Sequence, residues 1–232
     1  MVLRMNGRSY WGVALLSALT LAVGCGDLLR IDSFSRAPAE PLVGDAGGAD
    51  GDEGGGRPIM TMAEPRWVRT FGTPGDDQVA AAAVDGDDLV FVGDFDAPLD
   101  FGGGALLPIG DGDVFVTRLA VDGQHVSSFS FGGKGAAQAA AVAVDPASGD
   151  AVVTGCYSGD FKAGALSLPT SNAQDIFVMR IARDGKAVYA ASFGGAGNQC
   201  ASAIAIAADG SVLLAGHNNG TVVVGADTLV SD

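Results

Sequence analysis

The chain has 232 residues, of which 48% are hydrophobic and 17% charged, so it can bury a core of one or two domains. Its formal net charge is −14, and from Cys25 onward 11 basic and 27 acidic residues give −16. Such a negative surface repels phosphate backbones, which argues against nucleic acid as a partner. Aromatic residues make up only 7% of the chain, so close packing has to come from aliphatic residues and glycine.

Residues 1–24 have the pattern of a secretory signal peptide. Arg4 and Arg8 precede an apolar run at residues 11–23, WGVALLSALTLAV, and no acidic residue occurs before Cys25. The run is 13 residues long, whereas a permanent membrane-spanning helix needs ~20. The sequence therefore predicts an export signal that is removed from the mature protein.

The segment Leu21-Ala22-Val23-Gly24-Cys25 resembles a bacterial lipobox, although the family places Leu three residues before the Cys, where this chain has Ala22. The resemblance implies cleavage before Cys25, a diacylglycerol thioether on its sulfur and acylation of the new amino terminus. Two or three acyl chains give stable attachment to a bilayer. We expect an exported lipoprotein anchored to the cell envelope, at the outer membrane. Whether it lies on the periplasmic or the surface side of that membrane stays open. The alternative is an ordinary secretory signal with an incidental cysteine.

Residues 25–65 are predicted to be a disordered tether. The stretch 41–58, PLVGDAGGADGDEGGGRP, lacks aromatic residues and any apolar period, so it cannot bury enough surface to offset the entropy of ordering. Its acidic residues lack the spaced ladder and closing Glu of a calcium-binding EF-hand loop.

The rest of the chain, residues 66–232, contains three copies of one unit, at about 67–127, 128–190 and 191–232. Equivalent phenylalanines are 60 and 62 residues apart, and equivalent glycines 62 and 61 apart: Phe71, Phe131 and Phe193; Gly93, Gly155 and Gly216. The segment DVFVTRLAVDG from Asp113 recurs 62 residues later as DIFVMRIARDG from Asp175. Several independent landmarks thus keep one period.

Each unit is predicted to consist of β-strands. Short apolar runs at 80–84, 141–144 and 203–206 are each followed, after a turn rich in Asp, Gly or Ser, by a second run at 89–93, 151–155 and 212–216. In the first unit, further strands are predicted around 99–107 and 114–120. The fold class is therefore all-β, with about four antiparallel strands per repeat.

The succession FGG-x-G-x-x-Q, AVAVD, VVTG, DF and DIFV-x-R resembles the bacterial β-propeller repeat of large surface and secreted proteins (SBBP-like), over about 70% of the chain. The resemblance implies tandem four-stranded blades. About two and two-thirds repeats are present, whereas propellers typically have four to eight blades. Three explanations stay open: a fragment of a longer protein, self-association of copies to close the propeller, or a small open array.

Few residues suggest chemistry. Cys156 and Cys200 fit either a disulfide, as exported proteins often have, or two small buried side chains. His125 and His217 are interpreted as loop residues, with a metal ligand or a catalytic base as the alternative. Acidic clusters at Asp85, Asp87 and Asp88 and at Asp111 and Asp113 are read as solvated turn carboxylates, with calcium as the alternative. The glycines of FGGKG and FGGAG are read as turn glycines, because a strand and not a helix is expected after them.

No catalytic motif is found: the chain has no Gly-x-Ser-x-Gly, no His-Glu-x-x-His and no Cys-x-x-Cys. We therefore expect a non-enzymatic, membrane-anchored scaffold that binds a protein or a glycan, without a cofactor. Two alternatives remain at this point. The chain is a fragment of a larger exported propeller enzyme, a hydrolase or lyase whose active site lies elsewhere, or it is a passive surface stalk.

Overall fold

The structure is a computed structural model and describes residues 2–5, 11–12 and 67–231. These residues form strands and turns, with no helix among them. The predicted all-β class is confirmed. Cys25 and the predicted tether lie outside the described residues, as does most of the predicted signal peptide. Within the described part, no helix is long and apolar enough to cross a membrane.

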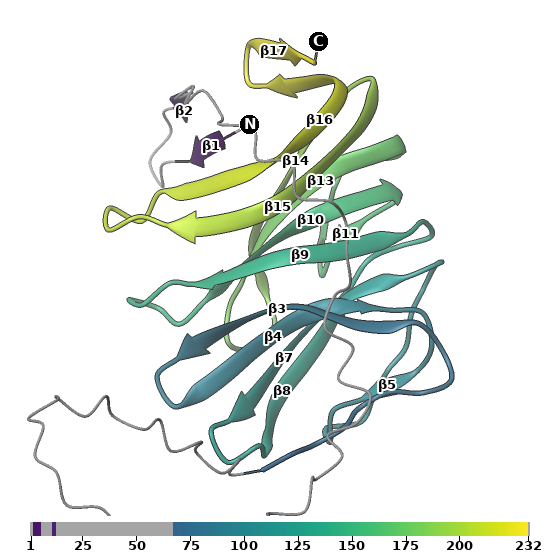
Figure 1. Cartoon of the computed structure of the whole chain (residues 1–232), viewed down its shortest axis with the longest axis vertical. Helices are drawn as coiled ribbons and strands as arrows, with labels where there is room; N and C mark the ends of the chain where they lie inside the picture. The colour runs from purple at the N-terminus through teal and green to yellow at the C-terminus, as the bar shows by residue number, and fades with distance from the viewer. Residues whose placement is uncertain (1, 6–10, 13–66, 232) are drawn as a thin grey trace, which may run out of the picture. The chain divides into compact units, whose positions relative to one another are not determined.

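Two four-stranded antiparallel sheets are built alike (Figure 1). The first contains, in this order, β3 (Asp77–Asp85), β4 (Asp88–Phe95), β7 (Asp113–Ala120) and β8 (His125–Phe131). The second contains β9 (Ala137–Val144), β10 (Ala151–Gly159), β13 (Ser171–Ile181) and β14 (Ala187–Phe193). The four strands of each sheet therefore follow one another in space as they do along the chain.

A third sheet begins in the same way. Its first two strands are β15 (Gly197–Ile206) and β16 (Val212–Val224), and β17 (Asp227–Val230) pairs with the end of β16. The next places belong to β1 (Val2–Met5) and β2 (Trp11–Gly12). In this pairing Arg4 lies opposite Leu213, the register that Arg118 has with Val90 and Arg180 has with Val152. The β16 edge thus pairs with an antiparallel strand in the register of the other two sheets.

The prediction of a sheet strand around 99–107 is wrong. This segment forms a separate small hairpin of β5 (Leu99–Asp100) and β6 (Ala105–Leu106), and the second repeat has its counterpart in β11 (Lys162–Ala163) and β12 (Leu166–Ser167). Gly102 and Gly104 have positive φ angles of 107° and 105°, which turn the chain back on itself. The fourth strand of each sheet is instead the segment that ends in Phe131 or Phe193, directly before the FGG glycines.

The sheets stack face to face. β9 lies against β3, β4 and β7 of the first sheet, and β15 lies against β9, β10 and β13. Aliphatic side chains from the facing strands, with Phe131 and Phe193, fill the two layers between the sheets. On the first strand of the second sheet, β9, alternating Ala and Val side chains supply this layer, among them Ala137, Ala139, Val142 and Val144.

Gly93 and Gly155 explain why a glycine recurs in the second strand. Each is paired across the sheet with a phenylalanine of the third strand, Phe115 or Phe177. A Cβ atom at Gly93 would lie 2.6 Å from the Phe115 ring and would also overlap the carbonyl oxygen of Gln78. At Gly155, too, the atom nearest to such a Cβ is a first-strand carbonyl oxygen, that of Gln138. The recurring glycine therefore allows the first strand to approach closely, and at Gly93 it also makes room for the Phe115 ring.

We expect Gly93→Ala to lower the free energy of unfolding by about 2–3 kcal/mol, because overpacking forces the ring and the neighbouring strand apart. Urea denaturation measures this. Gly112→Ala is the control, since its Cβ would meet nothing closer than 4.0 Å and should change stability by less than about 0.5 kcal/mol. Equal effects of the two substitutions would contradict the assignment.

Candidate functional site

The two histidines lie in different sheets. His125, on β8, is half-buried, its Nε2 lies 2.6 Å from Oγ of Ser128, and its ring stands against Gly103 of the small hairpin. His217, on β16, is exposed and is paired with Cys200 on β15. The structure therefore does not bring the two histidines into one site.

At one end of the sheets lie the turns after β3, β7, β9, β13 and β15, and we call this the turn end (residues 85–88, 120–124, 145–150, 182–186 and 207–211). Asp85 is 9% exposed here and forms an ion pair with Arg118 of β7, which is 3% exposed. Arg118 Nη2 also donates to the carbonyl oxygen of Gly149, in the second repeat, at 2.5 Å. Asp85 is therefore not a solvated turn carboxylate as predicted, but part of a contact between the first two repeats.

Arg183, from the second repeat, adds to this contact. Its guanidinium lies 2.5 Å from the carboxylate of Asp85 and 3.2 Å from that of Asp88. Arginine side chains thus supply the positive charge that the calcium alternative would assign to a metal ion. Among the described residues, no group of three or more His, Cys, Asp or Glu side chains is arranged to hold a metal ion.

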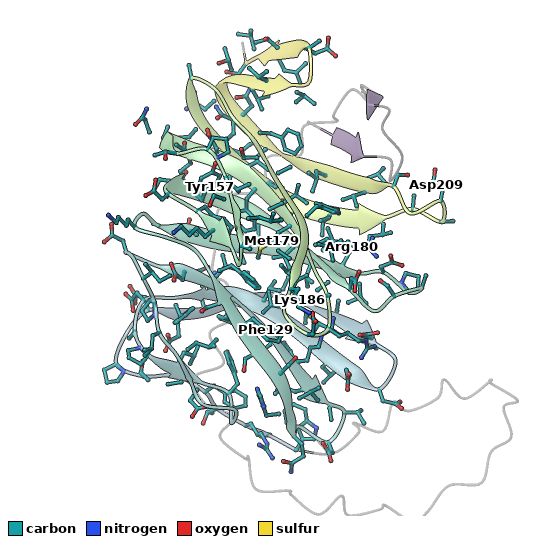
Figure 2. All side chains as sticks on the ribbon, turned by 180° about the vertical axis from the view of Figure 1, so that it is seen from behind. Phe129, Tyr157, Met179, Arg180, Lys186 and Asp209 are labelled. Carbon is teal, nitrogen blue, oxygen red and sulfur yellow. A yellow bond between two sulfur atoms is a disulfide. The ribbon has the colours of Figure 1, made fainter. Side chains whose placement is uncertain are left out.

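The second repeat has an equivalent ion pair. Arg180 on β13, labelled in Figure 2, reaches the turn after β9. There it pairs with Asp145 and, at 2.8 Å, with Asp150. Burial alone would lower the pKa of Arg180, but the hydrogen bonds to the two carboxylates outweigh it and raise that pKa. The backbone N–H of Ala147, helped by Arg180, lowers the pKa of Asp145. The Arg of the repeated DVFVTR and DIFVMR segments is therefore structural.

The opposite end of the sheets carries the small hairpins and the FGG segments, and we call it the hairpin end (residues 96–112, 132–136, 160–170, 194–196 and 220–231). Asp113 is fully buried there and accepts a hydrogen bond from the Ile109 N–H at 2.9 Å. Burial raises the pKa of Asp113, opposed by hydrogen bonds from the backbone of Ile109 and Gly133. Its carboxylate lies against Gly132, as Asp175 lies against Gly194. The Asp of DVFV and the glycine of FGG thus recur together because they touch.

The FGG segments link each sheet to the next. The N–H of Lys162 donates to the carbonyl oxygen of Gly132 at 2.9 Å, and the N–H of Val223 donates to that of Gly194 at 2.9 Å. A Cβ at Gly133 would collide with the backbone of Asp160. A strand, β9 or β15, follows each segment, so close backbone packing explains these glycines.

The hairpin end also exposes large aliphatic side chains from all three repeats. Leu107 is 64% and Ile109 68% exposed, and three further residues are exposed on the later hairpins: Leu166, Val223 and Val230. This feature is not predicted from the sequence, because 99–107 is interpreted there as a sheet strand. The glycine run 102–104 and Pro108 were the available signals that a sheet strand ends here.

Three equivalent positions follow the second-strand glycine and differ in side chain: Asp94, Cys156 and His217. Cys156, on β10, is joined by a disulfide to Cys200, on β15, with a Cα–Cα distance of 4.8 Å. The bond therefore links the second sheet covalently to the third. Asp94 accepts a hydrogen bond from the backbone of Ala139 in the second sheet, and burial raises its pKa to about 6.

Asp94→Asn is expected to raise the free energy of unfolding at pH 8 by about 1 kcal/mol, after discounting for the partial solvation of the side chain. The folded-state pKa of Asp94 is raised, so the carboxylate destabilises the fold increasingly as pH rises from about 4 to 6. The variant should therefore match the parent at pH 4. Urea denaturation at both pH values, with the exposed Asp111→Asn as control, tests this. A gain of equal size at pH 4 would contradict it.

Comparisons of the sequence with known protein families and with curated proteins gave no match.

Proposed function

We propose that the three sheets are successive blades of a β-propeller. Support comes from the order of the strands, first to fourth along the chain in each complete sheet, and from the repeated face-to-face stacking. The recurring Asp–Arg and Asp–Gly contacts support it too, since the first two repeats have them in the same place.

We further propose that the protein is exported and anchored to the cell envelope. The sequence pattern before Cys25 supports export and lipid anchoring, and the acidic, glycine-rich segment after it supports a flexible spacer. The anchor would hold the propeller region near a membrane and leave its surface available to partners.

The propeller region acts as a binding scaffold for a protein or a glycan, and its binding face is the hairpin end. The observation that carries this proposal is that the hairpins of all three repeats expose a large aliphatic side chain: Leu107 and Ile109, Leu166, and Val223 and Val230. Single valines, such as Val84 and Val121, are also exposed elsewhere. Exposed aliphatic groups gathered in one region mark interaction surfaces. They favour a protein partner, whose apolar side chains can cover them.

The turn end is a poorer candidate for the binding face. The carboxylates of Asp85, Asp145 and Asp150 are already paired with arginines of the same chain. A ligand would have to break these ion pairs before it contacted those three carboxylates, which leaves it only peripheral charges such as Asp87 and Asp122.

Photo-cross-linking in intact cells tests this function. A photoreactive amino acid replaces Leu107, Ile109 or Leu166 in turn, and the controls carry it at Val126 or Val188, which are also exposed but lie on β8 and β14. We expect one adduct of constant size from the hairpin-end positions and none from the controls. Protease treatment separates a protein adduct from a glycan adduct. A passive stalk would give no adduct at any position.

A further inference from the structure

The outer face of the first sheet repeats a surface that is covered elsewhere in the molecule. Val84, on β3, is 68% exposed, whereas its equivalent on β9, Val144, is packed against the first sheet. Val79 is likewise exposed, while its equivalent Ala139 is buried. β3 thus presents to solvent the face that β9 uses to pack on a preceding sheet.

The outer face of the third sheet is the complementary surface. On β10, Val152 and Cys156 are buried, and both face the third sheet, through packing on its core and through the disulfide. Their equivalents on β16 are Leu213, which is half-buried, and His217, which is exposed. β16 therefore presents the face that β10 uses to receive a following sheet.

The segment just before the first sheet also points to a missing neighbour. Phe129, on the fourth strand of the first sheet, stands against Gly185 in a turn of the second sheet. Trp67 stands in the same way against Gly123 in the corresponding turn of the first sheet, and its Nε1 donates to the Val121 carbonyl oxygen at 2.7 Å. Residues 67–71 form no strand, but Trp67 occupies at the first sheet the place that Phe129 of the preceding sheet occupies at the second.

We propose that two copies of this chain associate head to tail, with the outer face of β16 of one copy packed on the outer face of β3 of the other. The contact continues the sheet-to-sheet packing already present twice within the chain. Because the two faces differ, the contact is heterologous, and it forms twice when a two-copy ring closes.

The disulfide supplies a sharp test, because the same geometry recurs at each interface. In the three sheets, the same cross-strand pairing recurs between the second strand and the first: Asp94 with Gln78, Cys156 with Gln138, and His217 with Cys200. Cys156 is therefore equivalent to Asp94 and His217, and Cys200 is equivalent to Gln78 and Gln138. A cysteine pair at 94 and 138 should therefore bridge the first two sheets. A pair at 217 and 78 should bridge two copies.

The experiment mixes membrane-extracted full chains that carry His217→Cys alone with chains that carry Gln78→Cys alone. We expect a disulfide-linked two-copy species on non-reducing gels, formed only in the mixture and lost with reductant. Adding Val84→Glu to the Gln78→Cys chain should abolish it, because the charge falls in the proposed contact. The chain with Asp94→Cys and Gln138→Cys is the internal control and should form its bond within one chain.

Three results would overturn the proposal. Absence of the linked species while the 94–138 bond forms would show that β16 and β3 of two copies do not meet. Failure of the 94–138 bond would overturn the equivalence of the interfaces. When both substitutions are placed in one chain, a ladder of species larger than two copies would overturn the closed ring. None of these results depends on the hairpin end, so the binding function stands or falls separately.

Discussion

Reduction of the Cys156–Cys200 disulfide is expected to lower the free energy of unfolding by about 4 kcal/mol. The two cysteines are 44 residues apart in the sequence, and a crosslink closing a loop of that length restricts the unfolded chain by this amount in the chain-entropy description. Such a loss is a large part of the 5–15 kcal/mol that typically separates folded from unfolded domains.

Urea denaturation with and without reductant measures the effect. The matched control is the double variant Cys156→Ala with Cys200→Ala, which should already be destabilised and should not respond to reductant. A parent protein whose unfolding midpoint is the same with and without reductant would show that the bond contributes nothing.

Arg118→Met is expected to lower the free energy of unfolding by about 3 kcal/mol. Both partners of the Arg118–Asp85 pair are buried, and removing one member of a buried pair typically costs 3–5 kcal/mol because the other charge stays behind. Arg183 still pairs with Asp85, so the loss should fall at the low end. The carbonyl oxygen of Gly149 also loses its donor, which loosens the contact between the first two repeats.

Arg180→Met is the matched comparison, because Arg180 occupies the equivalent position in the second sheet but is more exposed. Arg180→Met should lower the free energy of unfolding by a smaller amount, about 1–2 kcal/mol. Denaturation of both variants under the same conditions checks the order. A larger loss for Arg180→Met would contradict the argument from burial.

The repeated strands could be predicted because their signals are local. Alternating apolar residues and Asp-Gly turns specify hairpins such as β3–β4, whose two-residue turn is Gly86-Asp87. The segment 99–107 was predicted wrongly for a local reason as well: its apolar ends were read as one strand, although three glycines interrupt it.

The contacts between repeats could not be predicted from local patterns. Arg118 donates to the carbonyl oxygen of Gly149, 31 positions away, and Arg183 pairs with Asp88, 95 positions away, and only the stacking of the sheets brings these groups together. The state of Cys156 and Cys200 likewise depends on the distance between two sheets. The position of His217 varies among the repeats and includes Asp94, but the burial of Asp94 between sheets is visible only in three dimensions.

The most direct test of a membrane-anchored scaffold is mass spectrometry of the amino-terminal tryptic peptide of the protein purified from bacterial membranes. The account predicts a peptide of residues 25–30, beginning at Cys25 and carrying a diacylglyceryl thioether, with retention at the membrane lost in Cys25→Ala. An amino terminus at another position, or an unmodified Cys25, would contradict the anchor and with it the placement of the sheets at the cell envelope.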